Sequence, residues 1–305
     1  MITMSEDIAD QNRRRYAIQR WSEDYFGIDE SGRMSVRPTR SDTPDVALTE
    51  IVERAHREGL RLPMLLRFPQ ILQGRAEQLI SAFQQAIDES DYGGSYTAVY
   101  PIKVNQQTTV VRPLANVEPM GLEVGSKPEL IAALAEARPG STLICNGYKD
   151  AAFIRLALSA IALGLKPVIV IEKPGEWALI EREARRLDVS PTLGVRLRLS
   201  SLGAGNWQNT GGERAKFGLS AAQVLELIES LRDSGCLDWL GLLHFHMGSQ
   251  LSNLRDIQHG VREAGRYLVE LVRAGVPIRL LDIGGGLGVD YEGGVLDQPA
   301  RVAIQ

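Results

Sequence analysis

From residue 96 onward, short apolar runs rich in β-branched and aliphatic residues alternate with longer amphipathic stretches. Seven such runs occupy residues 96–103, 121–126, 142–146, 167–173, 192–199, 239–248 and 278–286. The stretches between them, at residues 127–137, 151–163, 176–187, 221–234 and 254–273, carry apolar residues at helical spacing. This alternation predicts a parallel sheet with right-handed crossovers, either a doubly wound sheet or a (β/α)8 barrel.

The region before residue 96 follows a different pattern. Up to about residue 38 it contains a glycine turn at Gly32 and a short β-prone piece, which predicts an appended strand pair. Helical spacing then occupies residues 45–59 and 70–87. We therefore predict an N-terminal extension at residues 1–65 and a barrel domain at residues 66–305.

The polar residues that interrupt the apolar runs stand toward the ends of those runs. They are Lys103, Glu123, Asn146, Glu172, Arg196 with Arg198, His244 with His246, and Asp282. In a (β/α)8 barrel the chemical groups gather at the carboxyl ends of the strands. The face opposite the two histidines is apolar, with Leu243, Phe245 and Met247. The pattern favours a barrel, although any one of these polar residues could instead belong to a structural ion pair.

Composition and charge narrow the class of partner. The 305 residues are 44% hydrophobic and 24% charged, with a formal net charge of -4 and a pI near 5.7. Such a chain offers no basic surface for nucleic acid or an anionic membrane, so we expect a small-molecule partner. Two cysteines without paired spacing, a polar beginning and no apolar run of about 18 residues predict a cytoplasmic protein without a membrane span.

Lys103 is the first candidate for chemistry. It ends an apolar run that predicts a buried strand, and a desolvated lysine becomes an amine nucleophile toward carbonyl groups. The alternative is a lysine at a strand end whose ammonium group reaches solvent. The remaining motifs favour the catalytic amine.

A glycine-rich loop follows the seventh run, with the sequence Asp-Ile-Gly-Gly-Gly-Leu-Gly-Val-Asp-Tyr at residues 282–291. The backbone N–H groups of such a loop can surround a phosphate without obstruction by side chains. The loop does not fit the dinucleotide pattern G-x-G-x-x-G, because Val289 stands where the third glycine belongs. A plain turn is the alternative.

His244 and His246 form an H-x-H motif, which on a barrel strand can be half of a metal site. The other two histidines, His56 and His259, fall in helical stretches, so nitrogen ligands are too few. We predict that His246 stacks as a neutral imidazole on a flat cofactor and that His244 is a hydrogen-bonded core residue. A lysine, a stacking histidine and a phosphate-binding loop together describe a pyridoxal phosphate site.

Six longer motifs surround these residues. They are Tyr-Pro-Ile-Lys-Val-Asn-Gln at 100–106, Gly-Leu-Glu-Val-Gly-Ser-Lys at 121–127, Ile-Cys-Asn-Gly-Tyr-Lys-Asp at 144–150, Gly-Gly-Glu-Arg-Ala-Lys-Phe-Gly-Leu at 211–219, His-Phe-His-Met-Gly-Ser-Gln at 244–250 and Gly-Gly-Gly-Leu-Gly-Val-Asp-Tyr-Glu-Gly at 284–293. The chain resembles the biosynthetic arginine decarboxylases, a branch of the fold type III pyridoxal phosphate enzymes, from about residue 21 to 293. This implies an alanine-racemase-like (β/α)8 barrel, with about seven of its eight strands present, and an N-terminal extension that would join a β-domain.

The resemblance also implies roles for individual residues. Lys103 would be the Schiff-base lysine, His246 would stack on the pyridine ring, and Glu123 and Arg196 would be the acidic and basic groups near them. The implied phosphate contacts are Ser249, Gly284, Gly285 and Gly286. The implied substrate-binding loop consists of Ile283, Gly284, Gly285, Gly286, Leu287, Gly288, Val289, Asp290 and Tyr291.

The family reaction removes the α-carboxylate of L-arginine as carbon dioxide to give agmatine, a step toward putrescine and spermidine. The resemblance also implies Mg2+, with no ligands assigned, and a homo-oligomer of at least two subunits. After Glu292 the sequence departs from the family pattern, so we expect the eighth strand and several catalytic groups to lie beyond Gln305.

An open sheet with two unpaired edges predicts poor solubility or pairing with other chains. The resemblance also implies that the carboxylate pairing with the pyridine nitrogen lies beyond Gln305, and without it the electron sink is weakened, so we expect slow or no decarboxylation by this chain alone. Two other interpretations stay open. One is a non-catalytic truncated decarboxylase that only binds pyridoxal phosphate or a partner, and the other is a metal-dependent barrel hydrolase.

Overall fold

The computed structural model describes residues 4–40, 45–199, 217–251 and 253–289. The chain divides into two compact units, Met1–Ala82 and Phe83–Val289. The predicted boundary after residue 65 stays a prediction. No helix within the described ranges is long and apolar enough to cross a membrane.

The first unit contains a small antiparallel sheet with helices on either side of it in the sequence. Its elements are α1 (Met4–Arg15), α2 (Ile18–Trp21), β1 (Phe26–Ile28), β2 (Met34–Val36), β3 (Val46–Ala47) and α3 (Leu48–Arg57). The strand order is β1-β2-β3. Asp29 turns the chain between β1 and β2, because its Oδ1 accepts the backbone N–H groups of Ser31 and Arg33. The strand pair is confirmed, and β3 was not predicted.

The second unit is built on a seven-stranded sheet, in which every pairing is parallel. The strands are β4 (Ala98–Pro101), β5 (Met120–Val124), β6 (Thr142–Cys145), β7 (Lys166–Ile171), β8 (Thr192–Arg196), β9 (Leu240–His244) and β10 (Leu280–Asp282). Each of the seven predicted runs overlaps one of them, and β5 and β7 begin one residue before their runs. The strands lie side by side in chain order from β4 to β10, without the reversal of order that defines a doubly wound sheet. This order is that of a (β/α)8 barrel.

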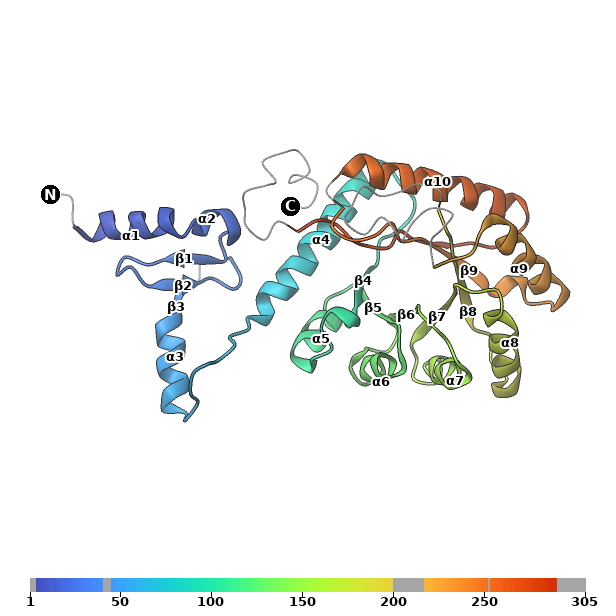
Figure 1. The fold of residues 1–305 in the computed structure, drawn as a ribbon, viewed down its shortest axis with the longest axis horizontal. Coiled ribbons are helices and arrows are strands. Elements are labelled where there is room, and N and C mark those ends of the chain that lie inside the picture. The colour runs from blue at the N-terminus through green and yellow to red at the C-terminus, as the bar shows by residue number, and fades with distance from the viewer. Residues whose placement is uncertain (1–3, 41–44, 200–216, 252, 290–305) are drawn as a thin grey trace. The chain divides into compact units, whose positions relative to one another are not determined.

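Helices cover the outer face of this sheet. They are α5 (Thr108–Ala115), α6 (Lys127–Glu136), α7 (Ala151–Ser159), α8 (Glu176–Leu187), α9 (Ala221–Asp233) and α10 (Leu254–Arg273). The boundary between the two units falls within α4 (Pro69–Glu89), which precedes β4 in the chain. Figure 1 shows α5 to α8 as a row along one face of the strands. Polar caps begin several of them: Asp150 Oδ1 accepts the N–H of Phe153 at the start of α7, and Ser220 and Gln223 form a capping box at α9.

The two faces of the sheet bury different side chains, as the alternation of a strand requires. The face toward the helices includes Leu243, Phe245 and Met247, which belong to the large core cluster, as the sequence predicts. The opposite face carries a smaller cluster of Ile144, Val168, Val170 and Leu242. An aliphatic inner wall therefore underlies the carboxyl ends of the strands.

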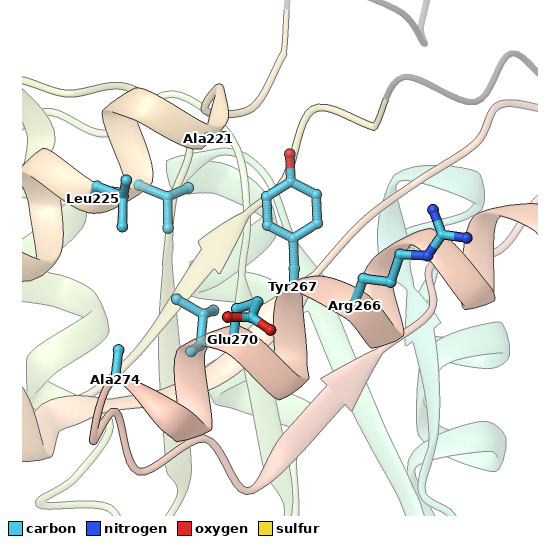
Figure 2. A pocket seen from close by; sticks show the side chains of 8 residues that line it. Ala221, Leu225, Arg266, Tyr267, Glu270 and Ala274 are labelled. Carbon is cyan, nitrogen blue, oxygen red and sulfur yellow. The ribbon is translucent and has the colours of Figure 1, made fainter.

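A hollow of about 310 Å³ lies between α9 and α10 (Figure 2). Leu225 and Ala221 of α9 line it, together with Arg266, Tyr267 and Glu270 of α10. The residues that line it lie on or next to two helices of the outer layer. None of the polar residues at the carboxyl ends of the strands lines this hollow.

Candidate active site

The register of the sheet brings the candidate residues to one edge. Pro101, two residues before Lys103, pairs with Glu123 on β5, and His244 on β9 pairs with both Arg196 on β8 and Asp282 on β10. Because the strands are parallel, their carboxyl ends meet at this edge. The sequence prediction that these polar groups gather there is confirmed.

Lys103 does not occupy a buried strand, so that expectation was wrong. Strand β4 ends at Pro101, and Lys103 lies in the short 3-10 helix η1 (Ile102–Val104), where its side chain is exposed while Ile102 is buried. The side chain reaches solvent, as in the alternative given above, so burial does not make this amine a nucleophile. The turn does leave the amine accessible at the carboxyl edge of the sheet. Its positive charge still acts on Glu123 and His246.

Glu123 lies on β5 among several charges. Burial raises the pKa of its carboxyl group above the ordinary value, and the charge of Asp282 acts in the same direction. His244, Lys103 and Arg196 act in the opposite direction without cancelling the effect of burial. A carboxyl group with a raised pKa can hold or exchange a proton closer to neutral pH than an exposed glutamate can.

Arg196 ends β8 and forms an ion pair with Glu172, with 3.0 Å between Arg196 Nη1 and Glu172 Oε2. The Glu172 side chain is 2% exposed and that of Arg196 is 14% exposed. The guanidinium carbon of Arg196 also lies 5.1 Å from the centre of the Phe217 ring. These contacts fix a positive charge at the carboxyl edge of the sheet.

His244 is buried and contacts polar groups on both sides of its ring. Its Nδ1 lies 2.9 Å from Asp282 Oδ2, and its Nε2 lies 3.3 Å from Asn146 Nδ2. Burial alone would raise the pKa of Asp282, but the charge and hydrogen bond of His244 and the N–H of Gly284 lower it below its ordinary value. The prediction that His244 is a core histidine is confirmed by its burial and by the contact of Nε2 with Asn146, and Nδ1 has the carboxylate of Asp282 as its ion-pair partner.

His246 is held neutral by its surroundings. Burial lowers its pKa to about 4, and the charges of Arg196, His244 and Lys103 act in the same direction. Its Nδ1 accepts the backbone N–H of Gly285 at 3.4 Å. Near neutral pH, Nδ1 is therefore an acceptor, and the ring presents an uncharged aromatic face.

The low pKa of His246 predicts a specific pH dependence of stability. Because the folded pKa lies below that of an unfolded histidine, the unfolded chain takes up a proton first as the pH falls. Stability should therefore decrease between about pH 6.5 and pH 4, and the His246→Gln variant should lose this part of the decrease. Urea unfolding at pH 7.5 and pH 5 in both chains measures the difference, and an equal loss of stability in the two would contradict the expectation.

The glycine loop after β10 lies against the segment after β9. Gly284 has φ +66° and Gly286 has φ +98°, so both adopt left-handed backbone conformations. A Cβ on Gly284 would meet the carbonyl oxygen of Phe245 at 2.5 Å. The carbonyl of Gly286 accepts the N–H of Leu251, and Gly288 donates its N–H to the Leu251 carbonyl.

A Cβ on Gly285 would meet nothing within 4 Å, so the loop is open on that side, while the Gly285 N–H is donated to His246 Nδ1. Ser249 is exposed, with its Cα 3.3 Å from the position of a Cβ on Gly286. The structure thus brings four predicted phosphate contacts together: Ser249, Gly284, Gly285 and Gly286. Of the predicted substrate loop, Val289 is exposed, while Asp290 and Tyr291 lie outside the described residues.

No role for Lys149, Glu176 or Phe217 was predicted from the sequence. Lys149 falls within a motif quoted above, but nothing in its neighbours along the chain indicates burial. Its side chain is fully buried against Glu176, 27 residues later. The pairing of β6 with β7 and the packing of α7 on α8 bring these two segments together.

Within the described ranges, no group of three or more histidine, cysteine, aspartate or glutamate side chains could hold a metal ion. The barrel hydrolase interpretation therefore has no support from the described residues. The expected Mg2+ has no ligand set among them either, so it stays a prediction.

Parallel strands in chain order, with an accessible lysine, a neutral histidine and a glycine loop at their carboxyl ends, define a barrel suited to pyridoxal phosphate. Residues 75–302 match the family model described as "Pyridoxal-dependent decarboxylase, pyridoxal binding domain". The chain belongs to this family of pyridoxal-dependent decarboxylases.

Several relatives of this chain are biosynthetic arginine decarboxylases. A biosynthetic arginine decarboxylase of Xanthomonas campestris is 57% identical over 292 residues, covering 95% of this chain and 46% of the relative. A biosynthetic arginine decarboxylase of Xylella fastidiosa is 53% identical over 294 residues, which cover 96% of this chain and 46% of the relative. The chain thus spans about half the length of the curated relatives it matches.

Among solved structures, the biosynthetic arginine decarboxylase of Campylobacter jejuni matches with a TM-score of 0.83 and 30% identity. The match covers 95% of this chain and 48% of that one. The predicted barrel class of the family is therefore confirmed, and the predicted resemblance to arginine decarboxylases is confirmed as well.

Proposed function

We propose that this chain binds pyridoxal phosphate through Lys103 and forms the cofactor-binding part of an enzyme that decarboxylates L-arginine to agmatine. The observation that carries this proposal is the convergence of Lys103, His246 and the Gly284–Gly286 loop at one edge of the barrel sheet. The family model supports the cofactor, and the names of the relatives support the reaction.

The residues at this edge fit the cofactor. The accessible amine of Lys103 would hold it covalently, and the uncharged His246 ring offers a flat surface for the pyridine. Gly285 leaves room for a phosphate, with Ser249 beside the loop. Once bound, pyridoxal phosphate supplies an electron sink for the pair of electrons left when a carboxylate departs as carbon dioxide.

The charged side chains would orient the bound groups. Arg196 presents a positive charge, held by Glu172 and Phe217, that acts on both His246 and Glu123. The carboxyl of Glu123, with its raised pKa, could hold a proton near Lys103. Residues 283–289 would face the substrate, since they follow the strand end next to His246.

The cofactor proposal is tested by a trapping experiment. The purified chain is incubated with pyridoxal phosphate, reduced with borohydride and mapped by peptide mass spectrometry, and the adduct should lie on Lys103. This readout depends on the pyridoxal-binding residues alone, so it suits a chain that spans half the length of its relatives. A chain that traps no pyridoxyl group would overturn the proposal.

The substrate proposal has its own test. Because an amino acid's α-amine competes with Lys103 for the cofactor, L-arginine added before borohydride should protect Lys103 from labelling. Nα-acetyl-L-arginine keeps the side chain but lacks a free α-amine, so it should give no protection. The acid that selects the guanidinium group is expected beyond Gln305, so this test addresses the amino-acid part of the substrate. Equal protection by both compounds would show that no α-amine exchanges with Lys103 and would overturn the substrate proposal.

We also propose a homo-oligomer in the cytoplasm, with Mg2+ as a second cofactor. Strands β4 and β10 are the outermost of the described strands, so each has a strand partner on one side only. Unpaired strand edges favour association with another polypeptide segment, which supports the homo-oligomer. Both cysteines are free and buried, as in a reducing compartment. Only the resemblance supports Mg2+.

A further inference from the structure

A fully buried lysine lies behind the candidate site. Lys149 stands in the loop between β6 and α7, and its Nζ donates to the carbonyl of Gly147 at 2.6 Å. Its Nζ also lies 3.2 Å from Glu176 Oε2 and 3.4 Å from Glu176 Oε1. Burying an ammonium group costs free energy unless charged partners compensate for it. The carboxylate of Glu176 is the charged partner that compensates for burial of the Lys149 ammonium.

Glu176 connects the lysine to the end of the neighbouring strand. It is the first residue of α8, and its Oε2 also accepts the backbone N–H of Glu172 at 2.9 Å. Glu172 directly follows β7, and its own carboxylate forms the 3.0 Å ion pair with Arg196. A continuous series of contacts therefore runs from Lys149 through Glu176 and Glu172 to Arg196.

We propose that Lys149 is a positioning residue, which orients Arg196 by holding Glu176 as the acceptor for the backbone of Glu172. This inference rests on the proposed function, in which Arg196 supplies the fixed charge beside the cofactor ring. Without Lys149, the Glu176 carboxylate would stay buried with no cation, so it would take up a proton or turn toward solvent. The end of β7 would then lose its anchor, and Glu172 would no longer hold Arg196 in one orientation.

His246 reports the position of Arg196 without any cofactor. The charge of Arg196 is one of the causes that lower the pKa of His246, after burial. The other charges that act on it are those of His244, Lys103 and Asp282. His244 contacts Asn146, three residues before Lys149, so an effect through His244 has to be separated from one through Arg196. A rise in the His246 pKa that occurs in Lys149→Met and again in Glu176→Ala, which keeps Lys149 and its bond to the Gly147 carbonyl, would indicate movement of Arg196.

The test is an NMR titration of the His246 imidazole in the 305-residue chain, assigned with the His246→Gln variant. In Lys149→Met the pKa of His246 should rise by about half a unit to one unit, because Arg196 relaxes away. Lys127→Met is the matched control, since Lys127 pairs with Asp150, next to Lys149, at 2.6 Å but is half-exposed. It should leave the pKa unchanged. A folded Lys149→Met chain with the wild-type His246 pKa would overturn the proposal.

If Lys149→Met does not fold, a second pair of variants tests the proposal. Glu176→Gln keeps an oxygen that can accept the Glu172 N–H, whereas Glu176→Ala removes it. The pKa of His246 should rise in Glu176→Ala and stay near the wild-type value in Glu176→Gln, and equal values in the two would overturn the proposal. These titrations use no pyridoxal phosphate, so their outcome is independent of whether Lys103 traps the cofactor.

Discussion

Replacing Lys103 with alanine is expected to abolish the pyridoxyl adduct that borohydride traps on the wild-type chain. Pyridoxal phosphate carries an aldehyde, and a stable link to the protein requires a primary amine in the site. Lys103 is the candidate because η1 exposes its side chain at the carboxyl edge and its charge acts on His246. The expected loss is at least 95% of the trapped label, on the order of a twentyfold decrease.

Lys173 provides the matched control. It also follows a strand of the sheet, since β7 ends at Ile171, and its Nζ lies 3.7 Å from the centre of the Tyr148 ring. Lys173→Ala should trap as much label as the wild-type chain, and on Lys103. The chain has only six lysines, so each can be mapped individually. If label persists in Lys103→Ala, or moves to Lys173, then pyridoxal phosphate reacts with any accessible lysine and not with a specific binding site.

Much of the barrel could be predicted from the sequence, because each strand is a short apolar run with a polar residue at its end. The seven runs and the inner and outer faces of the sixth run follow from local alternation. The choice between a barrel and a doubly wound sheet needed the strand order, which depends on contacts between distant segments. In the first unit, β3 has two residues, too few for an alternating pattern to identify it.

In the candidate site, too, some features could be predicted from the sequence and others could not. The glycine loop and the pair of histidines could be predicted because their chemistry is visible within a few residues of sequence. The exposure of Lys103 could not, since it depends on the turn that η1 makes after Pro101. The burial of Lys149 could not either, because its partner lies on the next strand-helix unit.

Replacing Gly284 with alanine is expected to destabilise the loop that carries the phosphate contacts. Gly284 has φ +66°, a conformation that costs an L-residue about 1 kcal/mol or more. Its Cβ would also stand 2.5 Å from the carbonyl oxygen of Phe245 and 2.9 Å from Nδ1 of His246. The Phe245 carbonyl belongs to the backbone just after β9, and this backbone cannot move without disturbing the buried Phe245 side chain. Strain and overpacking together should cost about 2–5 kcal/mol.

Gly285→Ala is the matched control because a Cβ there meets nothing within 4 Å and the backbone is not left-handed. In the chain without cofactor, its stability should equal that of the wild type, whereas Gly284→Ala should unfold at lower urea concentration. Hydrogen exchange at the Leu251 and Gly288 amides, which bond across this loop, should accelerate in Gly284→Ala alone. Equal urea midpoints and equal exchange rates in the two variants would show that the close approach of the loop to Phe245 and His246 does not exist in solution. Without that approach, Gly285 could not donate its N–H to His246, and the phosphate-binding loop and the stacking ring would not form a single site.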